Sequence, residues 1–211
     1  MLPSIKKVIL TTIIASFFSI YGLVFNNNVI LIAAANIAPT AFSFYYIIRD
    51  FILTKNMQIG KFILYFLISI IIPLLMGMFF GYILEVLKTK YTNEDTDNLN
   101  IPSTYMKEKI TYHHINMIMS IFIPILSCLL LPYSLETNNV CLIIGVSIAL
   151  SFIVPITTIG LFIGSNKHTD KLYTIKDYII PIITFTINFI CIIIISFIMI
   201  KYLGFDKKIK N

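Results

Sequence analysis

The sequence predicts an all-α protein, a bundle of about six transmembrane helices that form one domain. Of its 211 residues, 58% are hydrophobic and 12% are charged, and the mean hydropathy is +0.90. Soluble domains carry about 25% charged residues, so this chain lacks the side chains that cover a water-facing surface. The composition excludes a disordered chain, a disulfide-stapled secreted domain and nearly any soluble enzyme.

Six apolar stretches are long enough to cross the roughly 30 Å hydrocarbon layer as helices of about 20 residues. They cover residues 8–25, 29–48, 62–87, 115–132, 140–164 and 179–203. Asn26, Asn27 and Asn28 predict a tight polar turn between the first two, and residues 88–114 form the long polar loop. Lysines before the first stretch also fit a signal peptide, but no small-residue cleavage site follows, so we expect this span to be retained.

The distribution of Lys and Arg between the spans sets the expected orientation. With the N-terminus inside, nine of the sixteen basic residues fall on the cytoplasmic side and seven on the other. This excess favours a cytoplasmic N-terminus and C-terminus, in a bacterial inner membrane. The net charge of +6 is then explained by anchors at the membrane edge, and we expect no nucleic-acid partner.

Weakly polar side chains recur at helical spacing within the spans. Asn36, Thr40 and Ser43 share one face of the second span, and Asn188 lies in the sixth. An amide at membrane depth costs free energy unless it is hydrogen-bonded. We therefore expect these four side chains to border either a shared polar pathway or a helix-contact face, and the sequence leaves both interpretations open.

Two GxxxG motifs predict close contacts between helices, because small residues let backbones approach each other in a membrane. The motifs run from Gly77 to Gly81 and from Gly160 to Gly164. Pro73 and Pro155 each remove a backbone donor inside a predicted span, and they predict kinks there.

Residues that carry chemistry are sparse. Glu85 and Lys201 lie near predicted helix ends, where we expect them to reach the membrane interface, and this argues against a pump with a buried carboxylate. No HExxH, GxSxG or Walker A sequence is present. The cysteines, which lack CxxC spacing and are expected to be small buried hydrophobes, are Cys128, Cys141 and Cys191. We expect a protein that is not an enzyme and that binds no metal and no cofactor.

A basic segment, Arg49 to Lys61, separates the second and third spans, and Leu131-Pro132-Tyr133-Ser134-Leu135-Glu136 follows the fourth. In this layout the whole chain resembles the small membrane subunits of ABC-2-type ABC transporters. The resemblance implies a permease subunit whose partner is a separate ATPase, docking through residues 49–61 and the chain ends. The chain departs from that family at residues 54–57, which lack the proline that such permeases often carry before the third span.

The favoured function is therefore a transport-related permease subunit in the lipid bilayer, partnered by a separate ATPase or by a second copy of itself. The alternative is an inner-membrane immunity or exclusion protein that binds a pore-forming toxin or a phage component, because small-residue faces suit helix recognition equally well. A membrane enzyme that uses Cys128 or Cys191 as nucleophile has the least support, since a reactive thiolate needs basic, partly wet surroundings.

Overall fold

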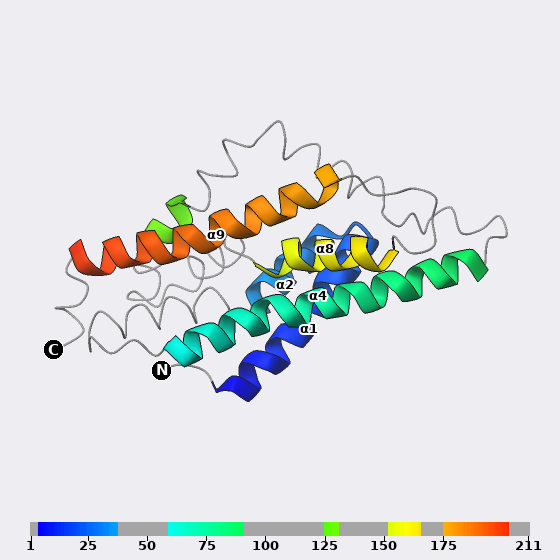
Figure 1. Cartoon of the computed structure of the whole chain (residues 1–211), viewed down its shortest axis with the longest axis horizontal. Helices are drawn as coiled ribbons and strands as arrows, with labels where there is room; N and C mark the ends of the chain where they lie inside the picture. Colours follow the sequence, from blue (N-terminus) through cyan, green and yellow to red (C-terminus); the bar gives the residue numbers. More distant parts are fainter. Residues whose placement is uncertain (1–3, 38–58, 91–124, 131–151, 166–174, 203–211) are drawn as a thin grey trace.

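The computed structural model describes residues 4–37, 59–90, 125–130, 152–165 and 175–202 (Figure 1). The labelled helices are α1 (Ile5–Val24), α2 (Asn28–Ile37), α4 (Ile59–Lys90), α8 (Ile153–Ser165) and α9 (Ile175–Tyr202). Residues 125–130 form one further helical segment. Among the described residues only Ser4, residues 25–27 and Phe152 are not helical, so the all-helical prediction is confirmed for this part of the chain.

α1 and α2 form a hairpin through the predicted asparagine turn. Asn26 adopts a left-handed backbone conformation with φ of 53°, and the next N–H, that of Asn27, donates to the carbonyl oxygen of Gly22 at 2.8 Å. The side-chain oxygen of Asn27 then accepts hydrogen bonds from two backbone N–H groups in the first turn of α2, at 3.1 and 3.2 Å. One asparagine thus ends α1 and its neighbour caps α2.

Aromatic and aliphatic contacts set the directions of the long helices. Val8 at the start of α1 packs with Tyr65 near the start of α4, and Phe17 further along contacts Phe80 with 5.7 Å between ring centroids. From the first contact to the second, the residue numbers rise along both helices, so α1 and α4 are parallel. On α9 the order is reversed, because Phe62 contacts Phe189 while Phe66 also reaches Phe185, each at 6.2 Å. α9 therefore runs antiparallel to α4 (Figure 1).

α8 is short and central. It lies between α4 and α9 (Figure 1), and most of its residues are buried. The sequence predicts one uninterrupted span over 140–164, whereas the chain bends at Phe152 and α8 begins only at Ile153. Its 13 residues extend over about 20 Å, less than the thickness of a hydrocarbon layer. Pro155 lies in the first turn of α8, where a helix needs no N–H donor. The predicted kink stays a prediction, because residues 140–151 lie outside the described residues.

α4 has two opposite faces of different character. Its exposed large apolar side chains include Ile63, Leu67, Ile71, Leu75, Phe79, Tyr82 and Val86. Its buried side chains are mostly small or polar. Six of them recur at every fourth position, which are Tyr65, Ser69, Pro73, Gly77, Gly81 and Glu85. Only 28% of its most apolar window is buried, whereas the core helix of a soluble protein buries its large apolar side chains.

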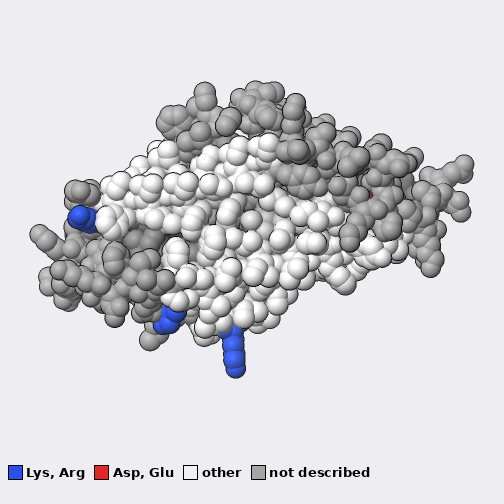
Figure 2. Space-filling model, viewed as in Figure 1, with Lys and Arg blue, Asp and Glu red and all other residues white. Residues whose placement is uncertain are grey.

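Two of the described helices are long and apolar enough to cross a membrane, over Ile5–Val24 and Gly60–Leu87. Figure 2 shows one face of the molecule. Its described surface is almost wholly uncharged, and the basic side chains drawn in blue lie at its margins. The larger number of six spans stays a prediction.

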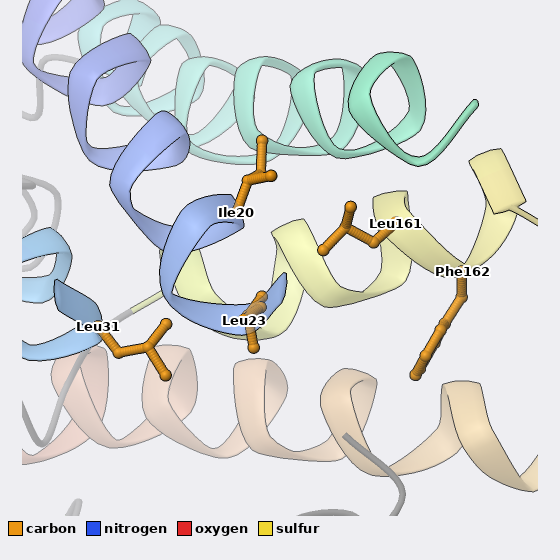
Figure 3. Close-up of a cluster of buried hydrophobic side chains, with 5 residues drawn as sticks. All are labelled: Ile20, Leu23, Leu31, Leu161 and Phe162. Carbon is orange, nitrogen blue, oxygen red and sulfur yellow. The ribbon is translucent and has the colours of Figure 1, made fainter. Parts of the chain in front are cut away.

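α1, α2 and α8 meet in one hydrophobic cluster. Figure 3 shows its five most buried members, which are Ile20, Leu23, Leu31, Leu161 and Phe162. Side chains of this size make many dispersion contacts when they pack closely. The cluster holds the α1–α2 hairpin against α8 and so positions the polar contacts described next.

Candidate functional site

The two GxxxG motifs pack against each other, Gly77 and Gly81 on α4 against Gly160 and Gly164 on α8. A Cβ atom placed on Gly77 would lie 2.6 Å from the carbonyl oxygen of Thr157 and 2.9 Å from the Cα of Gly160. On Gly81 it would lie 2.6 Å from the carbonyl oxygen of Leu161. Since residue numbers rise together along both helices, α4 and α8 are parallel, and their backbones touch without intervening side chains.

Hydroxyl side chains line the neighbouring contact between α1 and α8. Thr12, Ser16 and Ser19 are buried on one face of α1, and Thr157 is buried on α8. The Thr157 hydroxyl donates to the carbonyl oxygen of Ile153 at 2.7 Å, which uses its single proton. The Ser19 and Thr157 oxygens lie 2.6 Å apart, and either hydroxyl can donate in this hydrogen bond. When the Thr157 proton goes to Ile153, Ser19 is the donor.

The hydroxyl row formed by Thr12, Ser16, Ser19 and Thr157 holds helices together and offers no reactive group. Thr12 and Ser16 donate to carbonyl oxygens of their own helix at 2.7 Å each, so their protons are already engaged. Within the described ranges, no three His, Cys, Asp or Glu side chains are placed to hold a metal ion. What the arrangement offers is rigid positioning of α1, α4 and α8.

Sequence reasoning missed the hydroxyl row, although a signal was present. Thr12, Ser16 and Ser19 have the same spacing of four and then three residues as Asn36, Thr40 and Ser43. Of these two polar faces, the structure describes all three residues of the one on the first span.

The predicted pathway residues are only partly described. The Asn36 side-chain nitrogen donates to the carbonyl oxygen of Ile32 within α2, at 3.1 Å, and Asn188 is buried on α9. Thr40 and Ser43 lie outside the described residues. Residues next to both asparagines contact the start of α8. Ile37, which follows Asn36, packs in the cluster that holds Ile153. Near Asn188, the rings of Phe185 and Phe189 lie 5.4 and 6.3 Å from the ring of Phe152, measured between centroids. A shared pathway stays a prediction.

Glu85 differs from the sequence-based expectation. The carboxyl side chain is 1% exposed, so the expectation that it reaches the interface is wrong. The physical reason is its register: Glu85 follows Gly77 and Gly81 at steps of four residues and lies on the face that contacts α8. Lys201, by contrast, is exposed near the end of α9, with its Nζ 5.7 Å from the ring centroid of Phe197.

Two cysteines lie in one apolar cluster. Cys128 and Cys191 are free thiols, both buried, and they pack with Phe152 and Ile192. The expectation that they act as small hydrophobes is confirmed for this pair, while Cys141 lies outside the described residues. An apolar setting of this kind gives a thiol little tendency to ionise and attack.

Comparison with known proteins gives a family. A family model described as "Domain of unknown function (DUF389)" matches residues 30–194. The chain belongs to this family. The DUF389 match begins within α2, ends within α9 and includes both glycine motifs and Glu85, whereas α1 precedes it. No curated protein and no solved structure matches the chain.

Removing the hydrogen bond between Ser19 and Thr157 tests how α1 is attached to this DUF389 bundle. Ser19→Ala and Thr157→Val are each expected to lower the free energy of unfolding, with a coupling energy of roughly 0.6–1.7 kcal/mol in a double-mutant cycle, because hydrogen bonds between buried helices have this strength. Ser16→Ala is the matched control, since its hydroxyl bonds within α1. Equal coupling of Ser16 and Ser19 to Thr157 would contradict the assignment.

Proposed function

We propose that this DUF389 protein is a multi-pass inner-membrane protein that serves as a transport-related permease subunit without catalytic chemistry of its own. The partner is a separate ATPase subunit or a second copy of the chain. The support comes from the directions of the helices, their exposed faces and the short central helix α8.

The directions of the helices support six crossings. A chain that crosses a membrane repeatedly must reverse direction each time. α1, α4 and α8 lie in the first, third and fifth predicted spans and are parallel, whereas α2 and α9, in the second and sixth, run the opposite way. Such alternation is a condition that a soluble helical bundle does not have to meet.

The exposed faces support a lipid environment. Large apolar side chains point outward from α1, α4 and α9, and small or hydroxylated ones lie between the helices. In lipid this arrangement is favourable, because helices there associate through close packing and hydrogen bonds while lipid covers the apolar surface. In water the same surface would be a very large exposed apolar patch.

The observation that carries the transport proposal is the place where α8 begins. The helix begins at Ile153, deep in the bundle, with a bend at Phe152 that is fully buried. Non-helical backbone at membrane depth is tolerated only inside the protein or beside a water-filled cavity, and transporters use such broken helices to build their pathways. Asn36 and Asn188, whose neighbours contact this start of α8, are the side chains that we propose border the pathway, together with Thr40 and Ser43.

Charge placement favours a cytoplasmic N-terminus. Lys6 and Lys7 begin α1, Lys61 begins α4 and Lys201 ends α9. Because α9 is antiparallel to the other two, these four lysines belong to one side of the bundle. Lys88 and Lys90 at the end of α4 and Lys176 at the start of α9 make three on the other side. Lys residues concentrate on the cytoplasmic side of membrane proteins, so we propose that this side faces the cytoplasm.

The immunity alternative has less support from the packing. It requires small-residue faces that can receive a helix from a toxin or phage component. Gly77, Gly81, Gly160 and Gly164 are already paired with one another within the chain, so their faces are occupied. Recovery of a toxin or phage component with the purified protein would reverse this preference.

Cysteine accessibility tests the pathway without knowledge of the substrate. In a variant whose three native cysteines are replaced by alanine, Asn36→Cys and Asn188→Cys are treated with a membrane-impermeant thiol reagent. A water-filled pathway predicts labelling of both positions. Ser16→Cys is the control that should stay unlabelled, because Ser16 is buried on α1. If Asn36→Cys and Asn188→Cys were labelled no more than Ser16→Cys, the pathway would be contradicted.

The ATPase partner is tested by purifying the tagged protein from its native host in mild detergent and identifying what remains bound by mass spectrometry. An ATPase subunit in nearly equal amount is the expected result. Recovery of the protein alone would contradict coupling to a separate ATPase and favour a second copy as partner, which the mass of the purified complex then measures.

A further inference from the structure

A layer of aromatic rings lies beside the start of α8. This aromatic layer joins α4 to α9 and consists of the partly buried Phe62, Phe66, Phe185 and Phe189. The rings of Phe66 and Phe189 lie 4.8 Å apart, and those of Phe185 and Phe189 are stacked at 6.1 Å, measured between centroids. Phe152, immediately before α8, meets both α9 rings in edge contacts at 5.4 and 6.3 Å. The rings thus connect three segments of the chain.

Phe152 has an apolar environment. Its side chain is 0% exposed, and the other buried residues of its cluster are Cys128, Cys191 and Ile192. Asn188, which we place at the border of the pathway, is buried on α9 and lies in the sequence between the two phenylalanines of the aromatic layer. A polar side chain of the proposed pathway therefore belongs to the same helix segment as the rings.

We propose that Phe152 and the aromatic layer form a hydrophobic gate that keeps the pathway at the start of α8 dry and closed. An apolar constriction excludes water and dissolved solutes by dewetting, because a narrow passage without polar groups offers water no hydrogen bonds. Phe152 is the residue of the bend, where the backbone is not helical, and such element-terminal positions can change conformation without displacing a whole helix. The gate rests on the proposed transport function, since it needs a pathway to close.

A second buried phenylalanine provides the comparison. Phe162 is 1% exposed and lies on α8, in the cluster that holds α8 against α1 and α2. Because Phe152 and Phe162 are equally buried, replacing either one removes a similar amount of apolar contact. Only the change at Phe152 should alter the pathway.

The polarity of the side chain at position 152 tests the gate. Leucine and asparagine are similar in size, but an amide without a partner in a dry layer costs free energy that is recovered when water enters. Phe152→Asn is therefore expected to admit a small solute about tenfold faster than Phe152→Leu, and Phe152→Leu should stay close to the wild type. The probe is urea, which is small and neutral, and its entry into proteoliposomes is followed by light scattering.

Two native thiols give a second readout of water entry. Cys128 and Cys191 are buried and pack in the cluster of Phe152. In a Cys141→Ala background, a membrane-impermeant thiol reagent should label them in Phe152→Asn and leave them unlabelled in Phe152→Leu. Phe162→Asn and Phe162→Leu are the matched controls, and both should keep the wild-type urea entry and labelling even where they lower the thermal midpoint.

The gate is wrong if Phe152→Asn admits urea no faster than Phe152→Leu, because Phe152 then only fills space. It is also wrong if Phe162→Asn admits urea as fast as Phe152→Asn, because the whole bundle is then loosened. If either result accompanies labelling of Asn188→Cys in the variant without native cysteines, the pathway stands and the gate alone falls. Asn188→Cys that stays unlabelled even together with Phe152→Asn overturns the pathway and the gate with it. If Phe152→Asn does not fold, Phe152→Thr and Phe152→Val repeat the comparison with a smaller polar group.

Discussion

Replacing Leu75 by lysine is expected to prevent stable insertion of α4. Leu75 lies near the middle of α4 and is 57% exposed, on the apolar face. A lysine at the centre of a membrane helix costs roughly 2.5–3.5 kcal/mol on the insertion scale. At an exposed site in a water-soluble protein the same change stays within about 0.5 kcal/mol. The measurement uses a Lys88→Cys substitution in the last turn of α4, in the variant without native cysteines, and asks from which side of the membrane an impermeant thiol reagent labels it.

The matched control lies on the same face near the end of α4. Val86 is also exposed, and a lysine there can extend to the interface, so Val86→Lys is expected to insert almost normally. Leu75→Phe controls for the loss of leucine itself. If Leu75→Lys and Val86→Lys both behaved like the wild type, α4 would face water and the membrane proposal would be wrong.

Adding a single methyl group at Gly160 is expected to destabilise the bundle strongly. A Cβ atom there would lie 2.5 Å from the carbonyl oxygen of Leu74 and 2.9 Å from the Cα of Gly77. Both are backbone atoms, which cannot rotate away, so Gly160→Ala should reach the upper end of the 1–3 kcal/mol that overpacking usually costs. The thermal midpoint in detergent measures the effect.

Gly60→Ala is the control for this substitution. A Cβ atom on Gly60 meets nothing within 4 Å, and alanine is a better helix former by about 1 kcal/mol, so this variant should be as stable as the wild type or slightly more. The double variant Gly77→Ala and Gly160→Ala should lose less than the sum of its single effects, because both remove the same contact. Equal stability of Gly160→Ala and Gly60→Ala would contradict the close contact of α4 and α8.

Much of this architecture follows from local patterns. Composition predicts helices, the three asparagines predict the α1–α2 turn, and steps of four residues mark the face of α4 that carries Gly77 and Gly81. Each of these depends on neighbours in the sequence, through helical periodicity or turn conformation. Such patterns can be found without knowing which helices meet.

Other features depend on contacts between distant segments. Ser19 and Thr157 are 138 residues apart, and nothing local pairs them. Residues 140–164 contain no charged side chain, so hydropathy gives no sign that α8 begins at Ile153. Glu85 lies near the end of its span, so its depth predicts exposure at the interface, whereas its face on α4 is buried. The environment of these side chains depends on which helices pack together, and this cannot be inferred from local patterns in one sequence.

The direct backbone contact between α4 and α8 limits how this bundle can move. Helices whose backbones interlock at glycines cannot slide without collision, so α4 and α8 must travel as one rigid body. α9 meets α4 through the rings of Phe62, Phe66, Phe185 and Phe189, and side-chain layers of this kind permit the small shear displacements that packed helices use in conformational change. Any opening of the bundle would therefore occur along the aromatic layer, with the glycine-paired helices as its fixed frame.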